Sequence, residues 1–315
     1  MMRPLMNQLL LALLTLWLLT VLIFAGIRVL PGDVAIAILG QGATEEALAA
    51  LRHSLGVDAP ALSQYWHWLG QLAQGHLGNS LTTGMPIEPT LKFRLRNTLV
   101  LAGATSCLVV PLAVGLGVMA VMHQGRYLDR LCNAVILLLL SLPAFLVGYL
   151  LIFLLSVNVD LLPSLSVISP DMDAQAHFSA LALPVMTAAL AVLPYIMRMT
   201  RAALLDVMRQ PYIEQAVLKG LSRSRVVLMH AMPNAMGVII QALSLNIAYM
   251  VAGVVVIEQI FVYPGLGQYL VDAVGKRDVP VIQVSALIFG ATYIALNRTA
   301  DFLSRSSNPR LQGRS

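Results

Sequence analysis

The sequence contains 315 residues, of which 58% are hydrophobic and only 11% are charged. Charged residues make up about a quarter of an ordinary soluble domain, so this composition excludes that class and indicates a chain whose solvent is lipid. A formal net charge of +5 would suggest a nucleic-acid partner for a soluble protein, but in a membrane chain the distribution of charge determines topology instead.

The apolar residues are concentrated in blocks that are long enough to cross a hydrocarbon core of about 30 Å as helices. They do not alternate with period two, as the strands of an outer-membrane barrel would. The sequence therefore predicts an all-α, polytopic membrane protein with about six spans, at roughly residues 9–29, 98–122, 132–157, 180–200, 236–257 and 281–301.

The first predicted span is interpreted as an uncleaved anchor. Its uncharged run from Leu9 to Ile27 is too long for the core of a signal peptide. Three prolines, Pro143, Pro184 and Pro194, interrupt the third and fourth spans. Kinks at these prolines would shape a central cavity, because proline lacks the backbone N–H that a helix interior requires. The alternative is that the membrane helices tolerate them without a functional role.

Basic residues favour a cytoplasmic location for both termini. In that orientation the cytoplasmic segments hold most of the 20 basic residues, but among the acidic residues only Asp129, Asp206, Glu214 and Asp301. This positive-inside pattern selects a cytoplasmic N-terminus and a cytoplasmic C-terminus. The predicted domains are an anchor with a periplasmic subdomain, a transmembrane core that contains a cytoplasmic loop at 201–235, and a cytoplasmic tail; they cover residues 1–97, 98–301 and 302–315.

The external segment after the first span is long enough to fold by itself. An amphipathic helix is predicted from Thr44 to Leu55, with Thr44 and Glu45 at its start. The aromatic group Tyr65, Trp66 and Trp68 is typical of a position at the lipid interface.

The cytoplasmic loop between the fourth and fifth spans is basic and predicts a helix, a turn and a second helix. Gly220 allows the chain to turn, and Ser222 is a candidate cap for the second helix. An ordinary solvated loop whose arginines only enforce topology is the alternative.

Ordered motifs at characteristic spacing separate these alternatives. Glu214, Gln215 and Ala216 are followed by Gly220 and, thirteen residues later, by Pro233, a spacing that resembles the coupling motif of ABC importer permeases. The hydrophobic residues before Pro233 depart from that motif at His230. Further segments resemble the permease family of dipeptide, oligopeptide and nickel ABC importers, namely Leu30-Pro31-Gly32-Asp33, Leu55 to Pro60, Gly75 to Ser80, Val255 to Phe261, Pro264 to Gly267, Arg277 to Pro280 and Asn308-Pro309-Arg310.

This resemblance implies a type I ABC importer permease fold and a subunit that translocates di- or oligopeptides across the inner membrane. It implies partners as well: a second homologous permease, two ABC ATPase subunits and a periplasmic or lipid-anchored solute-binding protein. ATP and Mg²⁺ would lie in the ATPase subunits, and this chain would bind no cofactor. The residues implied to couple the permease to the ATPase are Glu214, Gln215, Ala216, Lys219, Gly220, Arg223, Arg225 and Pro233.

Candidates for the solute path or its gate lie around the fifth span. Glu258 is the acidic residue of that span, and an ionisable group at membrane depth is either paired or functional. Pairing with Arg277 or a backbone donor and direct lining of the path both stay open. The turn from Pro264 to Gly267 is expected to use its glycines for unusual backbone angles. The full set of candidates is Glu258, Phe261, Pro264, Gly265, Gly267, Arg277 and Asp278.

The remaining signals argue against catalysis. The phosphate loop and the H-E-x-x-H and G-x-S-x-G motifs do not occur in the sequence, which favours a channel-forming subunit over an enzyme. Cys107 and Cys132 are interpreted as packing residues, and no metal site is predicted, although contact of His67 or His76 with a metal complex stays open. Alternative functions are a permease for nickel or a metal-chelator complex and an ATP-independent secondary transporter.

Overall fold

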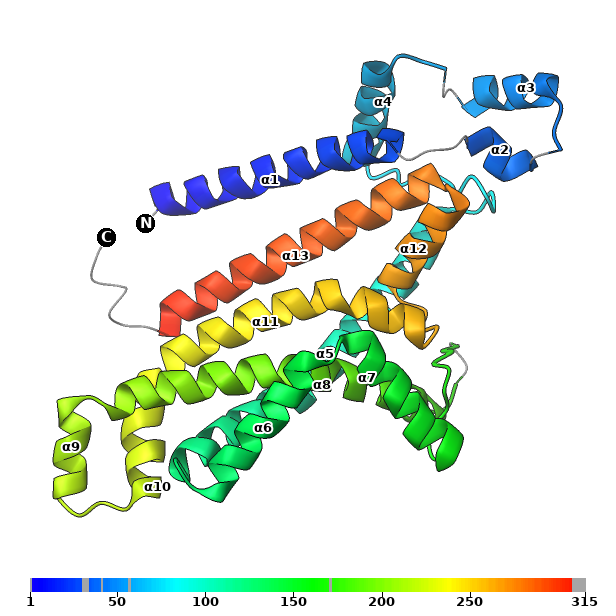
Figure 1. Cartoon of the computed structure of the whole chain (residues 1–315). Coiled ribbons are helices and arrows are strands. Elements are labelled where there is room, and N and C mark those ends of the chain that lie inside the picture. The colour runs from blue at the N-terminus through cyan, green and yellow to red at the C-terminus, as the bar shows by residue number, and fades with distance from the viewer. Residues whose placement is uncertain (1, 30–33, 41, 56–57, 170–171, 308–315) are drawn as a thin grey trace. The chain divides into compact units, whose positions relative to one another are not determined.

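The computed structural model is built from helices (Figure 1) and describes residues 2–29, 34–40, 42–55, 58–169 and 172–307. The sequence motifs at Pro31 to Asp33, Gly56-Val57 and Asn308 to Arg310 lie outside these residues. The helices are α1 (Met2–Val29), α2 (Val34–Leu39), α3 (Glu45–Leu55), α4 (Ala61–Ala73), α5 (Ile87–Met122), α6 (Tyr127–Ser141), α7 (Ala144–Leu151), α8 (Ala174–Met208), α9 (Pro211–Leu218), α10 (Arg223–Arg225), α11 (Met232–Ile260), α12 (Leu266–Lys276) and α13 (Val279–Ser307), with π-helical segments at Ile152–Asn158 and Val226–Ala231.

Five of the described helices are long and apolar enough to cross a membrane, and a sixth span results if a bent pair is counted as one. The five are Leu10–Val29, Ile87–Met122, Ala174–Met208, Arg223–Ile247 and Val279–Thr299. They correspond to the first, second, fourth, fifth and sixth predicted spans, so the all-α, multi-span fold class is confirmed.

The third predicted span is not one straight helix. Tyr127–Ser141 and Ala144–Asn158 meet at an angle of 103°. Leu142 and Pro143, which join them, are both extended. Proline disfavours a helical conformation in the residue before it, which explains the break at this position. By contrast, Pro184 and Pro194 lie inside the uninterrupted helix α8 and are buried there.

The chain divides by its contacts into two compact units. The first comprises Met1–Asn97 and Gly265–Ile294, and the second comprises Thr98–Pro264 and Ala295–Ser315. The first unit therefore combines α1 to α4 and the start of α5 with α12 and most of α13. The predicted division into an anchor with its subdomain, a transmembrane core and a tail stays a prediction.

The first unit has its own apolar core. It forms where the start of α5 packs against α12 and the start of α13, and its buried residues are Ile87, Leu91, Leu266, Ala273, Val281, Ile282 and Val284. Arg94 also joins α5 to α12: it donates a hydrogen bond of 2.7 Å to Gln268 Oε1 and lies over the Tyr269 ring. This contact gives a structural role to a basic residue that the predicted topology places outside the cell.

Helix α3 forms as the sequence predicts, and α4 is a further helix that carries the aromatic group. The Thr44 hydroxyl accepts a hydrogen bond from the Ala47 N–H at the start of α3, which confirms the predicted helix start. In α4, the Tyr65 hydroxyl lies 2.8 Å from the Thr20 hydroxyl of α1.

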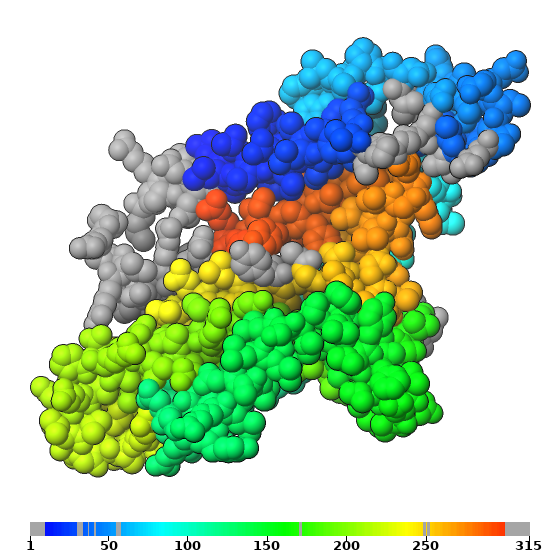
Figure 2. Space-filling view, viewed as in Figure 1, coloured from blue at the N-terminus to red at the C-terminus, as the bar shows by residue number. Residues whose placement is uncertain are grey.

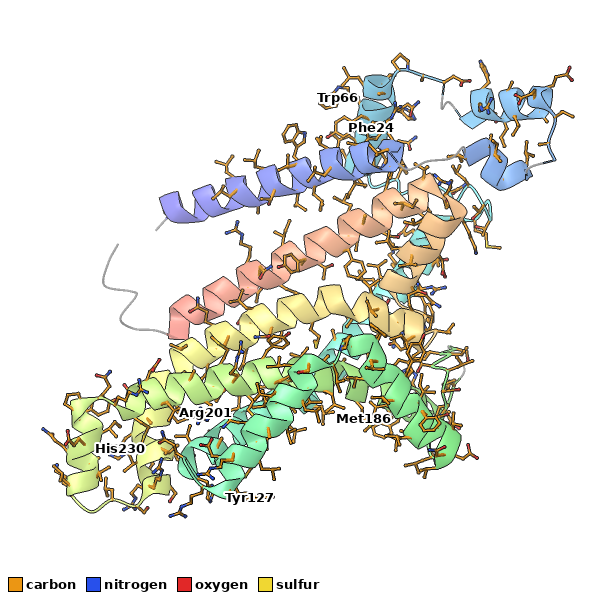
Figure 3. The ribbon with its side chains drawn as sticks, viewed as in Figure 1. Phe24, Trp66, Tyr127, Met186, Arg201 and His230 are labelled. Atoms are coloured by element: carbon orange, nitrogen blue, oxygen red, sulfur yellow. The ribbon has the colours of Figure 1, made fainter. Side chains whose placement is uncertain are left out.

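The aromatic group divides between two environments. Tyr65 and Trp68 pack on Phe24 of α1, with ring centroids 5.3 and 6.4 Å away. Trp66 is 56% exposed, and Figure 3 labels it together with Phe24. Of the three residues predicted at the lipid interface, Tyr65 and Trp68 therefore attach α4 to α1, and Trp66 keeps a side chain available for lipid.

The second unit is organised around α8, which packs against α6, α7 and α11. One buried cluster joins α5, α6 and α8 through Val109, Ala113, Ala120, Ile136, Ala189, Leu193, Ile196 and Met197. Helices α5 and α8 approach closely at Gly117. A methyl group added there would lie 2.9 Å from the Thr200 side chain and 3.2 Å from the Met197 carbonyl oxygen.

We predict that Gly117→Ala lowers the free energy of unfolding by about 1–3 kcal/mol, because the extra carbon overpacks the contact between α5 and α8. Gly115→Ala on the same helix is the matched control, since nothing lies within 4 Å of an added methyl group there. Alanine favours a helix over glycine by about 1 kcal/mol, so the control should be neutral or stabilising. Unfolding in mixed detergent micelles gives the free energy of unfolding of each variant. Equal changes in Gly117→Ala and Gly115→Ala would contradict the prediction.

Candidate functional site: the exposed hairpin and the cavity beside α8

The loop between α8 and α11 folds into a helical hairpin. Helix α8 ends at Met208, and α9 begins at Pro211, where proline is tolerated because a first-turn N–H has no intrahelical partner. Gly220 then adopts a φ of +78°, which confirms the predicted turn. The chain returns through α10 and the π-helical segment Val226–Ala231 into α11. Figure 1 shows α9 and α10 as the two arms of this hairpin.

The second arm of the hairpin begins at Ser222, as predicted, but without the predicted side-chain cap. Ser222 occupies the N-cap position of α10, yet its side chain makes no capping hydrogen bond. Its backbone carbonyl instead accepts a hydrogen bond from the Val226 N–H. Pro233 lies in the first turn of α11, where it leaves the helix intact.

One side of α9 is fixed in a hydrophobic core. Ile213 and Ala216 are buried together with residues from α5, α8 and the returning arm, namely Val118, Val121, Ala203, Leu204, Val226, Val227, Ala231, Ala235 and Ile239. Ala216 therefore permits close packing inside the hairpin. The hairpin is consequently a firm extension of helices α5, α8 and α11.

The other side of α9 is exposed. The polar motif residues Glu214, Gln215 and Lys219 face solvent, and among them lie two apolar residues, Val217 and Leu218, that are 54% and 80% exposed. The space-filling view in Figure 2 shows this yellow-green part of the chain uncovered. Adjacent exposed apolar side chains within a polar rim are typical of a surface that binds another protein.

The two arginines of the motif have different environments. The Arg223 guanidinium donates hydrogen bonds to the Val121 carbonyl at 3.0 Å and to Gln124 Oε1 at 2.8 Å, at the end of α5. A cation at a helix C-terminus is stabilised by the carbonyl groups that are left without intrahelical partners. Arg223 thus attaches the hairpin to α5, whereas Arg225 is exposed.

A largely buried ion pair lies near the base of the hairpin, with the Arg201 side chain 24% and the Asp129 side chain 7% exposed. Arg201, labelled in Figure 3, binds Asp129 with two hydrogen bonds of 3.0 and 3.2 Å. Asp129 also accepts hydrogen bonds from the Gly125 N–H and the Asn133 amide. The pair joins α6 to α8, and sequence reasoning did not identify it, because the two residues are 72 positions apart. The one indication of this pair in the sequence was the position of Asp129, an acidic residue in a short basic loop.

The candidate gate residue Glu258 is fully buried in the second unit. Its carboxylate accepts a hydrogen bond of 2.6 Å from the Thr98 hydroxyl, and its backbone carbonyl accepts one from the Tyr263 N–H. Phe261 is buried as well, in a cluster with Leu183, Ala188 and Ile257. Between the two alternatives for Glu258, this environment favours structural pairing, with Thr98 as the identified partner.

The expectation about backbone angles in the following turn is wrong. Gly265 is extended, with a φ of −98°, and Gly267 is helical within α12. The left-handed conformations occur instead at Val262 and Arg277, with φ of 51° and 58°. Arg277 has this conformation because it ends α12 in the position that commonly terminates a helix.

Asp278 connects two of the sequence motifs in the first unit. Its carboxylate accepts hydrogen bonds from the Ser80 hydroxyl at 2.5 Å, the Thr82 hydroxyl at 2.8 Å and the Leu81 N–H at 3.0 Å. Asp278 and Ser80 are both buried. The carboxylate of Asp278 therefore organises the turn that follows Asn79.

We predict that Asp278→Asn destabilises the first unit by about 2 kcal/mol, because an amide nitrogen faces donors that the carboxylate satisfied. Limited proteolysis should cleave the turn at residues 80–84 faster in the variant. Asp272→Asn, at an exposed position of α12, is the matched control and should leave the rate unchanged. An unchanged cleavage rate in Asp278→Asn would show that the carboxylate does not hold this turn.

The two histidines considered for a metal complex line the same cavity. His67 and His76, together with His53, line a cavity of about 780 Å³ in the first unit. Among the residues that the structure describes, no group of three histidine, cysteine or acidic side chains is suited to hold a metal ion.

A second cavity, of about 550 Å³, lies in the second unit beside α8. Its walls come from α7, α8 and α11, the helices that pack together there. The lining residues are Ala144, Ala188, Ala191, Val192, Tyr195, Arg198, Met199, Ala242, Leu245, Asn246, Met250, Gly253 and Ile257.

Several apolar spans, a cavity between helices and a firmly anchored hairpin define a multi-pass membrane transport subunit. Residues 113–313 match the family described as binding-protein-dependent transport system inner membrane component, and residues 1–102 match the corresponding N-terminal family. The chain therefore belongs to this family of inner-membrane ABC permeases, which confirms the resemblance inferred from its motifs.

Curated relatives cover almost the whole chain. It is 33% identical over 292 residues to the probable peptide ABC transporter permease protein y4tP of Sinorhizobium fredii, with 93% of each protein covered. It is 34% identical over 298 residues to the glutathione transport system permease protein GsiC of Escherichia coli K12, with 95% of each covered.

The fold also resembles a solved structure. An inward-facing chain of the MetNI methionine ABC transporter superposes with a TM-score of 0.58 at 18% identity, covering 69% of this chain and 96% of that one. This likeness confirms an ABC importer permease fold.

Proposed function

We propose that this chain is a channel-forming subunit of an ABC importer that moves peptides into the cell. The observation that carries the proposal is the hairpin: its base is fixed in a buried core, and Leu218 at its tip is 80% exposed. The curated relatives named for peptide and glutathione transport support peptides as the solute.

The proposed assembly contains a second homologous permease, two ABC ATPase subunits and a periplasmic or lipid-anchored solute-binding protein. ATP and Mg²⁺ are bound by the ATPase subunits, and this chain binds no cofactor. Both of its termini and the hairpin lie in the cytoplasm, in agreement with the distribution of Lys and Arg.

The geometry suggests how motion reaches the transport path. A groove on the ATPase binds the exposed face of α9, and ATP-driven closure of the two ATPases displaces the hairpin. Because Ile213 and Ala216 bury α9 against α5 and α8, that displacement moves the helices rather than the loop alone. Helix α8 lines the cavity, so its movement changes access from one side of the membrane to the other.

Reconstitution of the complete transporter in vesicles tests the proposal. We expect ATP-dependent uptake of peptides in the presence of the binding protein, and copurification of an ATPase subunit with this chain. Uptake driven by an ion gradient without ATP would instead identify a secondary transporter. ATP-dependent uptake of nickel or a metal-chelator complex, without peptide uptake, would replace the solute and retain the importer.

A further inference from the structure

The cavity of about 550 Å³ beside α8 has a mostly apolar wall with a few polar side chains. Most of its wall is made of alanine, glycine and aliphatic side chains, which provide space and an apolar surface. Polar groups come from Tyr195 and Arg198 on α8 and from Asn246 on α11. An apolar pocket of this size with a few polar groups is the usual form of a site for a small molecule.

Arg198 is the only cation among the lining residues. It lies on α8 ten residues before the helix ends and two residues before the predicted end of the fourth span at residue 200. Its side chain is exposed, so an anion that enters the cavity can reach it.

A comparison with Arg201, on the next turn of the same helix, isolates what is unusual about Arg198. Arg201 is neutralised by the bidentate ion pair with Asp129. Arg198 forms no ion pair or hydrogen bond with the residues that the structure describes, and its side chain is exposed at the cavity wall. The fold therefore pairs Arg201 with an internal carboxylate and leaves the Arg198 guanidinium at the wall of the cavity.

We propose that Arg198 binds a carboxylate of the solute during its passage through the cavity. The inference rests on the proposed function, because peptides carry a C-terminal carboxylate. The planar guanidinium fork binds a carboxylate through two parallel hydrogen bonds. The Tyr195 hydroxyl and the Asn246 amide supply further hydrogen-bonding groups, and the apolar wall accepts side chains of varied shape.

This arrangement recognises what peptides share and ignores what distinguishes them. A backbone carboxylate is common to all of them, whereas alanines, a glycine and flexible methionines at Met199 and Met250 impose little shape on a side chain. A single charge contact is also weak enough to release the solute, as conduction requires.

Equilibrium dialysis of the purified permease and ATPase complex, without the binding protein, tests the inference. The probe is one tripeptide library prepared twice, as free acids and as C-terminal amides, with retained peptides quantified by mass spectrometry. Wild-type protein should retain the free acids about tenfold more than the amides, the usual effect of a charge-assisted hydrogen bond. Arg198→Ala should bring this ratio close to one.

Two further variants complete the design. Arg209→Ala removes an exposed cation at the end of the same helix, outside the cavity, and should keep the wild-type ratio. Arg198→Lys retains the charge without the fork and should give an intermediate ratio. This variant provides the decisive measurement if Arg198→Ala does not yield a folded complex.

A wild-type ratio in Arg198→Ala or Arg198→Lys would overturn the inference, and so would a wild-type protein that retains both libraries equally or neither. Peptide uptake into vesicles, measured on the same preparations, separates this result from failure of the proposed function. If peptides enter with ATP while Arg198→Ala keeps its preference, only the carboxylate site is wrong. If peptides do not enter, peptide import itself is wrong.

Discussion

Leu218→Asp is expected to reduce ATP-driven uptake to the level measured without ATP. Leu218 is 80% exposed at the end of α9, next to the exposed Val217. If a groove of the ATPase covers this side chain, the substitution removes its apolar burial and places a charge in the contact. The combined loss is about 3 kcal/mol or more, which weakens the contact by a factor of more than about 100.

The fold should tolerate this change, because the core that holds the hairpin is formed by the opposite side of α9. The variant should therefore reach the membrane in normal amounts but retain little ATPase on purification. Leu161→Asp is the matched control, since Leu161 is a similarly exposed leucine in the connection between α7 and α8. Normal uptake by Leu218→Asp would rule out the exposed face of α9 as the contact with the ATPase.

Asp129→Ala is expected to lower the free energy of unfolding by about 3–5 kcal/mol, because it leaves the Arg201 guanidinium without its buried counter-charge. The double variant Asp129→Ala/Arg201→Ala should be less destabilised than the sum of the two single variants, since the pair is removed together. Unfolding of the purified chain in mixed detergent micelles gives the four values of this cycle.

The exposed ion pair between Lys92 and Glu88 provides a control for this cycle. Its atoms are 2.6 Å apart, shorter than the Arg201 to Asp129 distances, but both side chains are more than half exposed. Water screens such a pair, so its removal should cause little change. Strictly additive effects of Asp129→Ala and Arg201→Ala would show that the buried pair does not couple α6 to α8.

Local signals in the sequence predicted local structure well. The helix start at Thr44, the turn at Gly220 and the span positions each depend on a few adjacent residues, and the structure confirms them. The bend of 103° in the third span was underestimated, although Pro143 marked its position. A proline indicates where a helix is interrupted, but packing of the two halves determines the angle.

Contacts between distant residues were beyond the sequence. Arg223 is among the residues implied to couple the permease to the ATPase, and its hydrogen bonds to the end of α5 could not be read from the sequence. Arg198 and Arg201 are indistinguishable in the sequence, yet one is paired and the other lines a cavity. Only the position of Asp129 in space separates them.

The hydrogen bonds between Asp278 and residues 80–82 also impose an order on biosynthesis. The two sides of this contact are 196 to 198 residues apart. At a translation rate of about 5–20 residues per second, Asp278 is synthesised roughly 10–40 s after the turn that it stabilises. The first unit is therefore among the last parts of the chain to be completed, after the helices of the second unit up to α11 have been made. A ribosome that stalls before residue 278 leaves this turn open to proteases, however well the earlier spans have inserted.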